Sequence, residues 1–282
     1  MVKRTITVII GLPILIALII SGGLWLRIGL LVLSCVGLYE FYRALSGKIQ
    51  LIHYVGYFFS VVYFIFIMDA AGRSGAAGQS GTAAIHGYLL IILSAFILAT
   101  LAMTVIFYNK VDIRDCLVTI CGFFYVPFLL SFIYFVRDSS IYFVWLIFTS
   151  ASASDTFAYF VGRKWGRHKL IGTPSPSKSV EGCIGGIIGA ALVGFLYGQI
   201  AVNFIEIDYS AAGHIVLGAV VVSVVGAVFS QFGDLFASAV KRSAGIKDFG
   251  KVLPGHGGML DRFDGILVAA PVVYMVMTLI WI

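Results

Sequence analysis

The stretch His214–Ser238, HIVLGAVVVSVVGAVFSQFGDLFAS, decides the fold class of this chain. Its residues up to Gly233 carry no formal charge and are mainly apolar. A run of about 20 such residues is long enough to cross a bilayer as a helix. Asp234 follows near the end of the run, where a carboxylate at membrane depth is costly and therefore indicates function. The stretch predicts a membrane-spanning helix with a functional polar end.

The composition of the whole chain agrees with that prediction. Of 282 residues, 60% are hydrophobic and 11% are charged, against about 25% charged in an average soluble domain. This excludes an ordinary soluble fold and a disordered chain. The four cysteines contain no CxxC pair and are typical of small buried side chains rather than zinc ligands or disulfides. The net charge of +6 favours an anionic lipid surface or a phosphorylated substrate as partner, not nucleic acid.

Hydropathy predicts an all-α, polytopic integral membrane protein with about nine transmembrane helices. The first two runs are short and adjacent, so a hairpin explains them better than a cleaved signal peptide does. The predicted spans are Thr5–Ser21, Leu24–Tyr39, Leu51–Met68, Ile85–Phe107, Cys116–Val136, Ile141–Val161, Ile184–Ile205, His214–Ser238 and Gly265–Ile282.

The distribution of Lys and Arg predicts the orientation of the nine spans. Threading them alternately places 16 of the 19 basic residues on one side, with only Arg27, Arg73 and Arg137 on the other. The positive-inside rule then places the N-terminus in the cytoplasm and the C-terminus outside. We expect residues 1–140 to form a scaffold and dimer region. Residues 141–282 are expected to form a catalytic domain in the plasma (cell inner) membrane, with cytoplasmic loops 162–183 and 239–264 that form an active site facing the cytoplasm.

Carboxylates gather at the cytoplasmic ends of the later spans. Asp234, Asp261 and Asp264 would repel one another at a shared site unless a cation lay among them. Oxygen-only ligands without a Cys/His set favour Mg²⁺, which usually keeps waters and borrows substrate phosphates. Asp155, in a Ser-rich helical run, is a further candidate or a packing residue.

Basic residues and glycines surround these carboxylates in sequence. Glycines let backbone N–H groups approach an anion, and Lys and Arg supply charge for phosphate. The segment Gly255–Gly258, GHGG, adds His256, Gly257 and Gly258. An earlier loop, SPSKSVEG at Ser175–Gly182, resembles a phosphate-binding loop in composition but lacks the P-loop spacing. Together these features point to phosphoryl or nucleotidyl transfer on a lipid phosphate.

The run Ser238–Asp264, SAVKRSAGIKDFGKVLPGHGGMLDRFD, resembles the signature of the phosphatidate cytidylyltransferases, also called CDP-diacylglycerol synthases. The resemblance is strong over about residues 150–265, and the first five spans match only in hydropathy. It implies the reaction of CTP with phosphatidic acid to give CDP-diacylglycerol and pyrophosphate, in a membrane-embedded homodimer among lipids. It also implies a requirement for Mg²⁺, with a monovalent cation such as K⁺ alongside.

Carried onto this sequence, the resemblance assigns roles to individual residues. Metal ligands would be Asp234, Asp261 and Asp264, and the catalytic set would add Lys241 and Arg242. The groups that bind the phosphates of CTP and phosphatidate would be Ser175, Lys178, Ser179, Lys241, Arg242, Lys247, His256, Gly257, Gly258 and Arg262. Asp155, Glu181 and Asp248 are further candidates, as ligands or as residues that orient the basic groups.

Three other functions are weighed against this one. CDP-alcohol phosphotransferases also use Asp clusters, but their DGxxAR pattern is missing, because Asp264-Gly265 is followed by Ile-Leu-Val-Ala. A CTP-dependent polyprenol or dolichol kinase is the closer alternative and would release CDP instead of pyrophosphate. A transporter would place its carboxylates near the middle of the bilayer, whereas these are expected at one edge.

Overall fold

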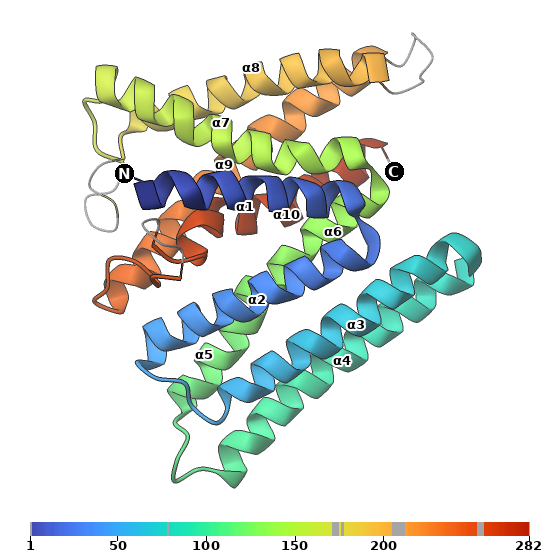
Figure 1. Cartoon of the computed structure of the whole chain (residues 1–282), viewed down its shortest axis with the longest axis vertical. Helices are drawn as coiled ribbons and strands as arrows, with labels where there is room; N and C mark the ends of the chain where they lie inside the picture. The colour runs from blue at the N-terminus through green and yellow to red at the C-terminus, as the bar shows by residue number, and fades with distance from the viewer. Residues whose placement is uncertain are drawn as a thin grey trace. The chain divides into compact units, whose positions relative to one another are not determined.

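The computed structural model describes residues 2–77, 79–170, 175, 178–204, 212–252 and 257–281. Within these ranges the chain folds into helices, with one isolated antiparallel bridge between Lys169 and Ser179 and no sheet (Figure 1). The all-α prediction is therefore confirmed. Contacts divide the chain into two compact units, Met1–Ser131 with Phe249–Leu260, and Phe132–Asp248 with Asp261–Ile282. The functional division near residue 140 stays a prediction.

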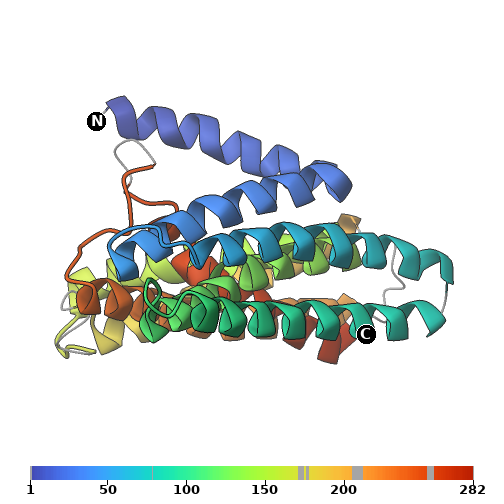
Figure 2. The same cartoon turned by 90° about the horizontal axis from the view of Figure 1, so that it is seen from below.

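The first unit contains the N-terminal helices. Gly22 and Gly23 have φ angles of 60° and 46°, which lets the chain turn directly from the first helix into the second. The third and fourth helices lie side by side as a long antiparallel pair (Figure 2). The helices are α1 (Val2–Ser21), α2 (Gly23–Ser46), α3 (His53–Ala77), α4 (Gln79–Ile106), α5 (Ile113–Phe123) and the π-helical turn η1 (Phe124–Phe128).

The turn η1 joins α5 to α6 (Leu129–Ser139), so that residues 113–139 form one apolar helical stretch. Pro127 lies inside η1. Proline has no N–H to continue an α-helical ladder, and the wider π turn accommodates that loss. Tyr63, Phe96 and Phe123 are almost fully buried in this unit, and the ring of Phe123 contacts the rings of the other two.

The second unit is built from α7 (Ile141–Trp165), α8 (Val180–Phe204), α9 (Ala212–Ser243) and α10 (Leu260–Trp281), together with most of α6. Ser140 caps α7 by accepting a hydrogen bond from the Tyr142 N–H at 3.2 Å. The helices α7, α8 and α9 pack closely on one another. Glycines on α8 allow this, because a Cβ at Gly189 would collide with the ring of Phe157 on α7.

Six helices among the described residues are long and apolar enough to cross a membrane. They correspond to α2, the residues 87–106 of α4, the stretch 113–139, α8, α9 and α10. Two shorter apolar helices, Gly11–Ser21 and His53–Phe66, coincide with further predicted spans. Large apolar side chains on these helices are exposed, such as Leu90 at 65% and Phe232 at 60%, as expected for surfaces that face lipid. The count of nine spans and their orientation stay predictions.

Candidate active site

The candidate site of the second unit is centred on Asp234, on α9. Its Oδ2 lies 2.9 Å from Nζ of Lys178, which comes from the loop before α8. The carboxyl groups of Asp155 on α7 and Asp264 on α10 both lie within hydrogen-bonding reach of Asp234. Three helices and one loop thus bring three carboxyl groups and one ammonium group together. Only two of these carboxyl groups belong to the predicted metal set, and the third is Asp155.

Asp261 makes a separate ion pair. Nζ of Lys241, near the end of α9, lies 2.8 Å from Oδ1 of Asp261, in the first turn of α10. The two side chains are 13% and 6% exposed. Their attraction is only weakly screened by solvent, so the pair fixes the end of α9 against the start of α10. Asp261 therefore comes from the same helical turn as Asp264 but has a different basic partner.

The donor chemistry fits a hard divalent cation that binds together with its substrate. Among the described residues, no group of three or more His, Cys, Asp or Glu side chains is arranged as an all-protein metal cage. Mg²⁺ does not need such a cage, because it usually takes one or two carboxylates and completes its shell with waters and phosphates. Carboxyl groups that converge on Asp234 offer this kind of partial set, since their mutual repulsion is relieved by a cation.

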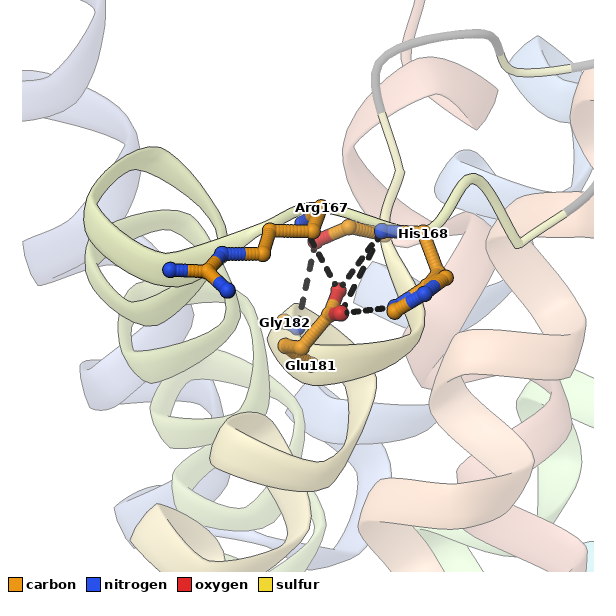
Figure 3. Close-up of polar contacts among 5 residues, drawn as sticks. Arg167, His168, Glu181 and Gly182 are labelled. Carbon is orange, nitrogen blue, oxygen red and sulfur yellow. Dashed lines mark hydrogen bonds and ion pairs between the residues drawn. The ribbon is translucent and has the colours of Figure 1, made fainter.

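Glu181, in the first turn of α8, holds the loop that leads to Lys178 (Figure 3). Its carboxylate accepts hydrogen bonds from the backbone N–H groups of Arg167 at 3.1 Å and His168 at 3.2 Å. Its Oε1 also lies 2.6 Å from Nδ1 of His168. The Lys169–Ser179 bridge closes the same loop. Glu181 therefore organises the loop through backbone contacts.

A pocket of about 320 Å³ adjoins the carboxyl cluster. It is shared by α7, α8 and α9, and Asp155 and Lys178 line it as well as belonging to the cluster. Its remaining lining is Ala158, Tyr159, Gly162, Arg163, Ser179, Gly182, Cys183 and Gln231. The second unit thus combines charged groups suited to phosphates with a neighbouring pocket large enough for an organic group.

In comparisons with known proteins, residues 2–280 match the cytidylyltransferase family. The chain belongs to the cytidylyltransferase family. A phosphatidate cytidylyltransferase of Staphylococcus haemolyticus is 31% identical over 95% of this chain and 95% of that protein. One of Staphylococcus saprophyticus is 30% identical over the same shares. One of Thermotoga maritima is 44% identical over 153 residues, which are 54% of this chain and 55% of that protein.

The remaining site residues predicted for this member of the cytidylyltransferase family are spread over both units. Arg242 donates to the carbonyl of Ile246 at 3.4 Å, and Oγ of Ser179 accepts from the Gly182 N–H at 3.2 Å. His256 lies outside the described residues. Lys247, Asp248 and Arg262 are exposed, and the carbonyl of Ser175 accepts from the Lys178 N–H at 3.2 Å.

In the first unit of this family member, Glu40 on α2 holds the backbone that directly follows Gly257 and Gly258. This carboxylate is 1% exposed and accepts hydrogen bonds from the N–H groups of Met259 at 3.0 Å and Leu260 at 2.9 Å. A Cβ at Gly258 would lie 2.7 Å from Glu40 Oε2. Gly257 has a φ of 84°, a conformation that favours glycine. Glu40 was missed by the sequence analysis, although a carboxylate in an apolar helical run is itself a signal of function.

Proposed function

We propose that this protein is a phosphatidate cytidylyltransferase, which converts CTP and phosphatidic acid to CDP-diacylglycerol and pyrophosphate. The observation that carries the proposal is the cluster around Asp234, where Asp155, Asp264 and Lys178 converge within a mostly apolar helical chain. Relatives that span 95% of the chain are named phosphatidate cytidylyltransferase. An apolar scaffold suits a lipid substrate, and the charged cluster suits a nucleoside triphosphate.

The chemistry required is an in-line displacement at phosphorus. An oxygen of the phosphatidate phosphate bonds to the α-phosphorus of CTP, and the α–β phosphoanhydride bond breaks with its electron pair leaving on pyrophosphate. The nucleophile is already an anion at neutral pH, so no strong general base is needed. The main barrier is the approach of two polyanions, which positioning and charge neutralisation overcome.

The residues of the cluster are suited to lower that barrier. Bound Mg²⁺ would be held by Asp234 and one of its two carboxyl neighbours, Asp155 or Asp264, and would neutralise phosphate charge and stabilise the leaving pyrophosphate. Lys178 faces Asp234 and is placed to exchange this carboxylate for a substrate phosphate. Lys241 holds Asp261 and so fixes the helical turn that carries Asp264. In this proposal Asp261 pairs with Lys241, whereas the signature implied that Asp261 binds the metal together with Asp234 and Asp264.

The proposal extends to topology and assembly. The apolar runs of the sequence indicate nine spans. The distribution of basic residues indicates an N-terminus in the cytoplasm and a C-terminus outside. The active site would then face the cytoplasm at the plasma membrane. A homodimer and a monovalent cation beside Mg²⁺ follow from the family resemblance. Cysteine accessibility from each side of the membrane tests the topology, and crosslinking in native membranes tests the dimer.

The deciding experiment uses purified protein with α-labelled CTP and phosphatidic acid, with and without Mg²⁺. We expect label in the lipid and release of pyrophosphate, both dependent on Mg²⁺, and neither in Asp234→Asn. In a parallel reaction with a polyprenol in place of phosphatidic acid, release of CDP with unlabelled lipid would instead identify a lipid kinase, whose γ-phosphate goes to the alcohol. Absence of label from the lipid with wild-type protein would refute the proposal, as would Asp234→Asn activity equal to wild type.

A further inference from the structure

Gln231 is a buried amide in the second unit that the proposed chemistry does not use. It lies on α9, three residues before Asp234, and is 9% exposed. Its Nε2 donates to Oγ of Ser154 on α7 at 2.9 Å and to the carbonyl of Cys183 on α8 at 3.1 Å. A backbone carbonyl only accepts hydrogen bonds, so the nitrogen of the amide must face Cys183. The orientation of the Gln231 amide is thereby fixed.

The fixed orientation leaves the other end of the amide as an acceptor. Both N–H groups of Nε2 are used, and no donor is bonded to Oε1 within the described part of the chain. Gln231 lines the pocket of about 320 Å³ beside the carboxyl cluster. Space for the amide depends on Gly186 of α8, because a Cβ there would lie 2.8 Å from Nε2 of Gln231. Three helices therefore build a rigid acceptor at the wall of this pocket.

The pocket is suited to a flat ring that carries a hydrogen-bond donor. Ala158, Gly162 and Gly182 contribute small walls, and Tyr159 adds an aromatic side chain, a type on which bases commonly stack. Both cations that line the pocket have partners of their own, since Arg163 donates to the Tyr159 hydroxyl at 3.2 Å and Lys178 contacts Asp234. A phosphate group beside Gln231 would also meet two acceptors, Gln231 Oε1 and the Asp155 carboxyl group. Lys178, which lines the pocket and contacts Asp234, connects it to the region suited to the triphosphate.

Cytosine and uracil differ at the edge that such an acceptor reads. Cytosine carries an exocyclic amino group, which donates, whereas uracil has a carbonyl oxygen at the same position, which accepts. We propose, on the basis of the function above, that this pocket binds the base of CTP and that Gln231 Oε1 accepts a hydrogen bond from the cytosine amino group. Against UTP, two acceptors would face each other. Gln231 thus selects the nucleotide, while the carboxyl cluster performs the transfer.

Gln231→Met tests the inference, because it keeps the side-chain length and removes both the acceptor and the donors. The measurement is kcat/KM for CTP and for UTP with saturating phosphatidic acid, together with KM for phosphatidic acid. We expect wild type to favour CTP strongly, and the variant to lose roughly tenfold or more of that preference, the scale of one base-edge hydrogen bond. KM for phosphatidic acid should stay unchanged. Gln199→Met, an exposed position on α8, is the matched control and should behave as wild type.

Thermal unfolding in detergent shows whether each variant is folded. A second variant keeps the test decisive if the first one does not fold. Ser154→Ala keeps the amide but removes one of the two acceptors that fix its orientation, so the CTP preference should fall here as well; if Gln231→Met does not fold, this variant decides. An unchanged CTP to UTP ratio in a folded, active variant would overturn the inference. So would a wild type that uses both nucleotides equally, or a higher KM for phosphatidic acid with the nucleotide preference intact. Failure of the proposed function is distinct, because wild type would then label no lipid.

Discussion

Removal of the Glu40 carboxylate should destabilise the protein by uncapping α10. In Glu40→Ala, the N–H groups of Met259 and Leu260 lose acceptors at 3.0 Å and 2.9 Å. Each buried N–H left without a partner costs about 1–3 kcal/mol, which gives roughly 2–6 kcal/mol for the two. The carboxylate no longer has to be desolvated, which offsets part of this cost. We therefore expect a net loss of about 2–4 kcal/mol in the free energy of unfolding.

Glu40→Gln should have about half that effect, because the amide keeps one acceptor oxygen and turns a donor toward the second N–H. Both variants should also lower kcat with little change in KM for CTP, since α10 carries Asp261 and Asp264 in its first turns. The assay is denaturant unfolding in mixed micelles, followed by helical circular dichroism, together with the labelled-CTP reaction.

Ser34→Ala is the control for this series. Ser34 is fully buried on the same helix, and its hydroxyl has no hydrogen-bond partner in the described part of the chain. Its removal should leave stability and activity close to wild type. The reasoning fails if Glu40→Ala unfolds within about 0.5 kcal/mol of wild type, the range of ordinary surface substitutions.

Three further predictions concern the charged groups. Lys178→Met should lower kcat by about 10²–10³-fold, the usual cost of losing one charge-stabilising group, and a loss below threefold in labelled-CTP assays would contradict this. Asp264→Asn should raise the Mg²⁺ concentration needed for half-maximal activity, and an unchanged Mg²⁺ titration would argue against a metal near Asp264. Glu181→Gln should loosen the loop before α8. We expect faster proteolysis near His168 and a several-fold higher KM for CTP. A variant that is cleaved no faster than wild type would show that the hydrogen bonds of Glu181 to Arg167 and His168 are dispensable.

The sequence predicts the helices well because each apolar run has the length of a bilayer and few interruptions. It also points to Asp234, Lys178 and Lys241, since charges in apolar surroundings need a reason. Their pairing could not be predicted, because it depends on how α7, α9 and α10 pack. Hydropathy cannot show that Lys178 reaches Asp234 across 56 residues while Lys241 reaches Asp261.

Two functional roles were harder to predict from the sequence, that of the neutral Gln231 and that of Glu40, whose partners are distant in the chain. Gln231 is a polar side chain in an apolar helix, which is more often a packing residue than a ligand. Glu40 is separated from Met259 by 219 residues, so its role exists only in the folded chain. In the sequence, Glu40 is a charged residue among the aromatic residues Tyr39, Phe41 and Tyr42, and nothing there indicates its partner.

The place of residues 249–260 within the first unit bears on how the protein is made. Ribosomes deliver the N-terminal helices first, and domains generally fold in that order. Here the acceptor, Glu40, emerges early, whereas its donors at Met259 and Leu260 emerge only after the helices α7, α8 and α9. The first unit therefore stays incomplete until these three helices have been made. A nascent or prematurely terminated chain that ends before Met259 would lack the two backbone N–H groups that Glu40 of α2 accepts from in the folded protein, a feature by which membrane quality control would recognise and degrade it.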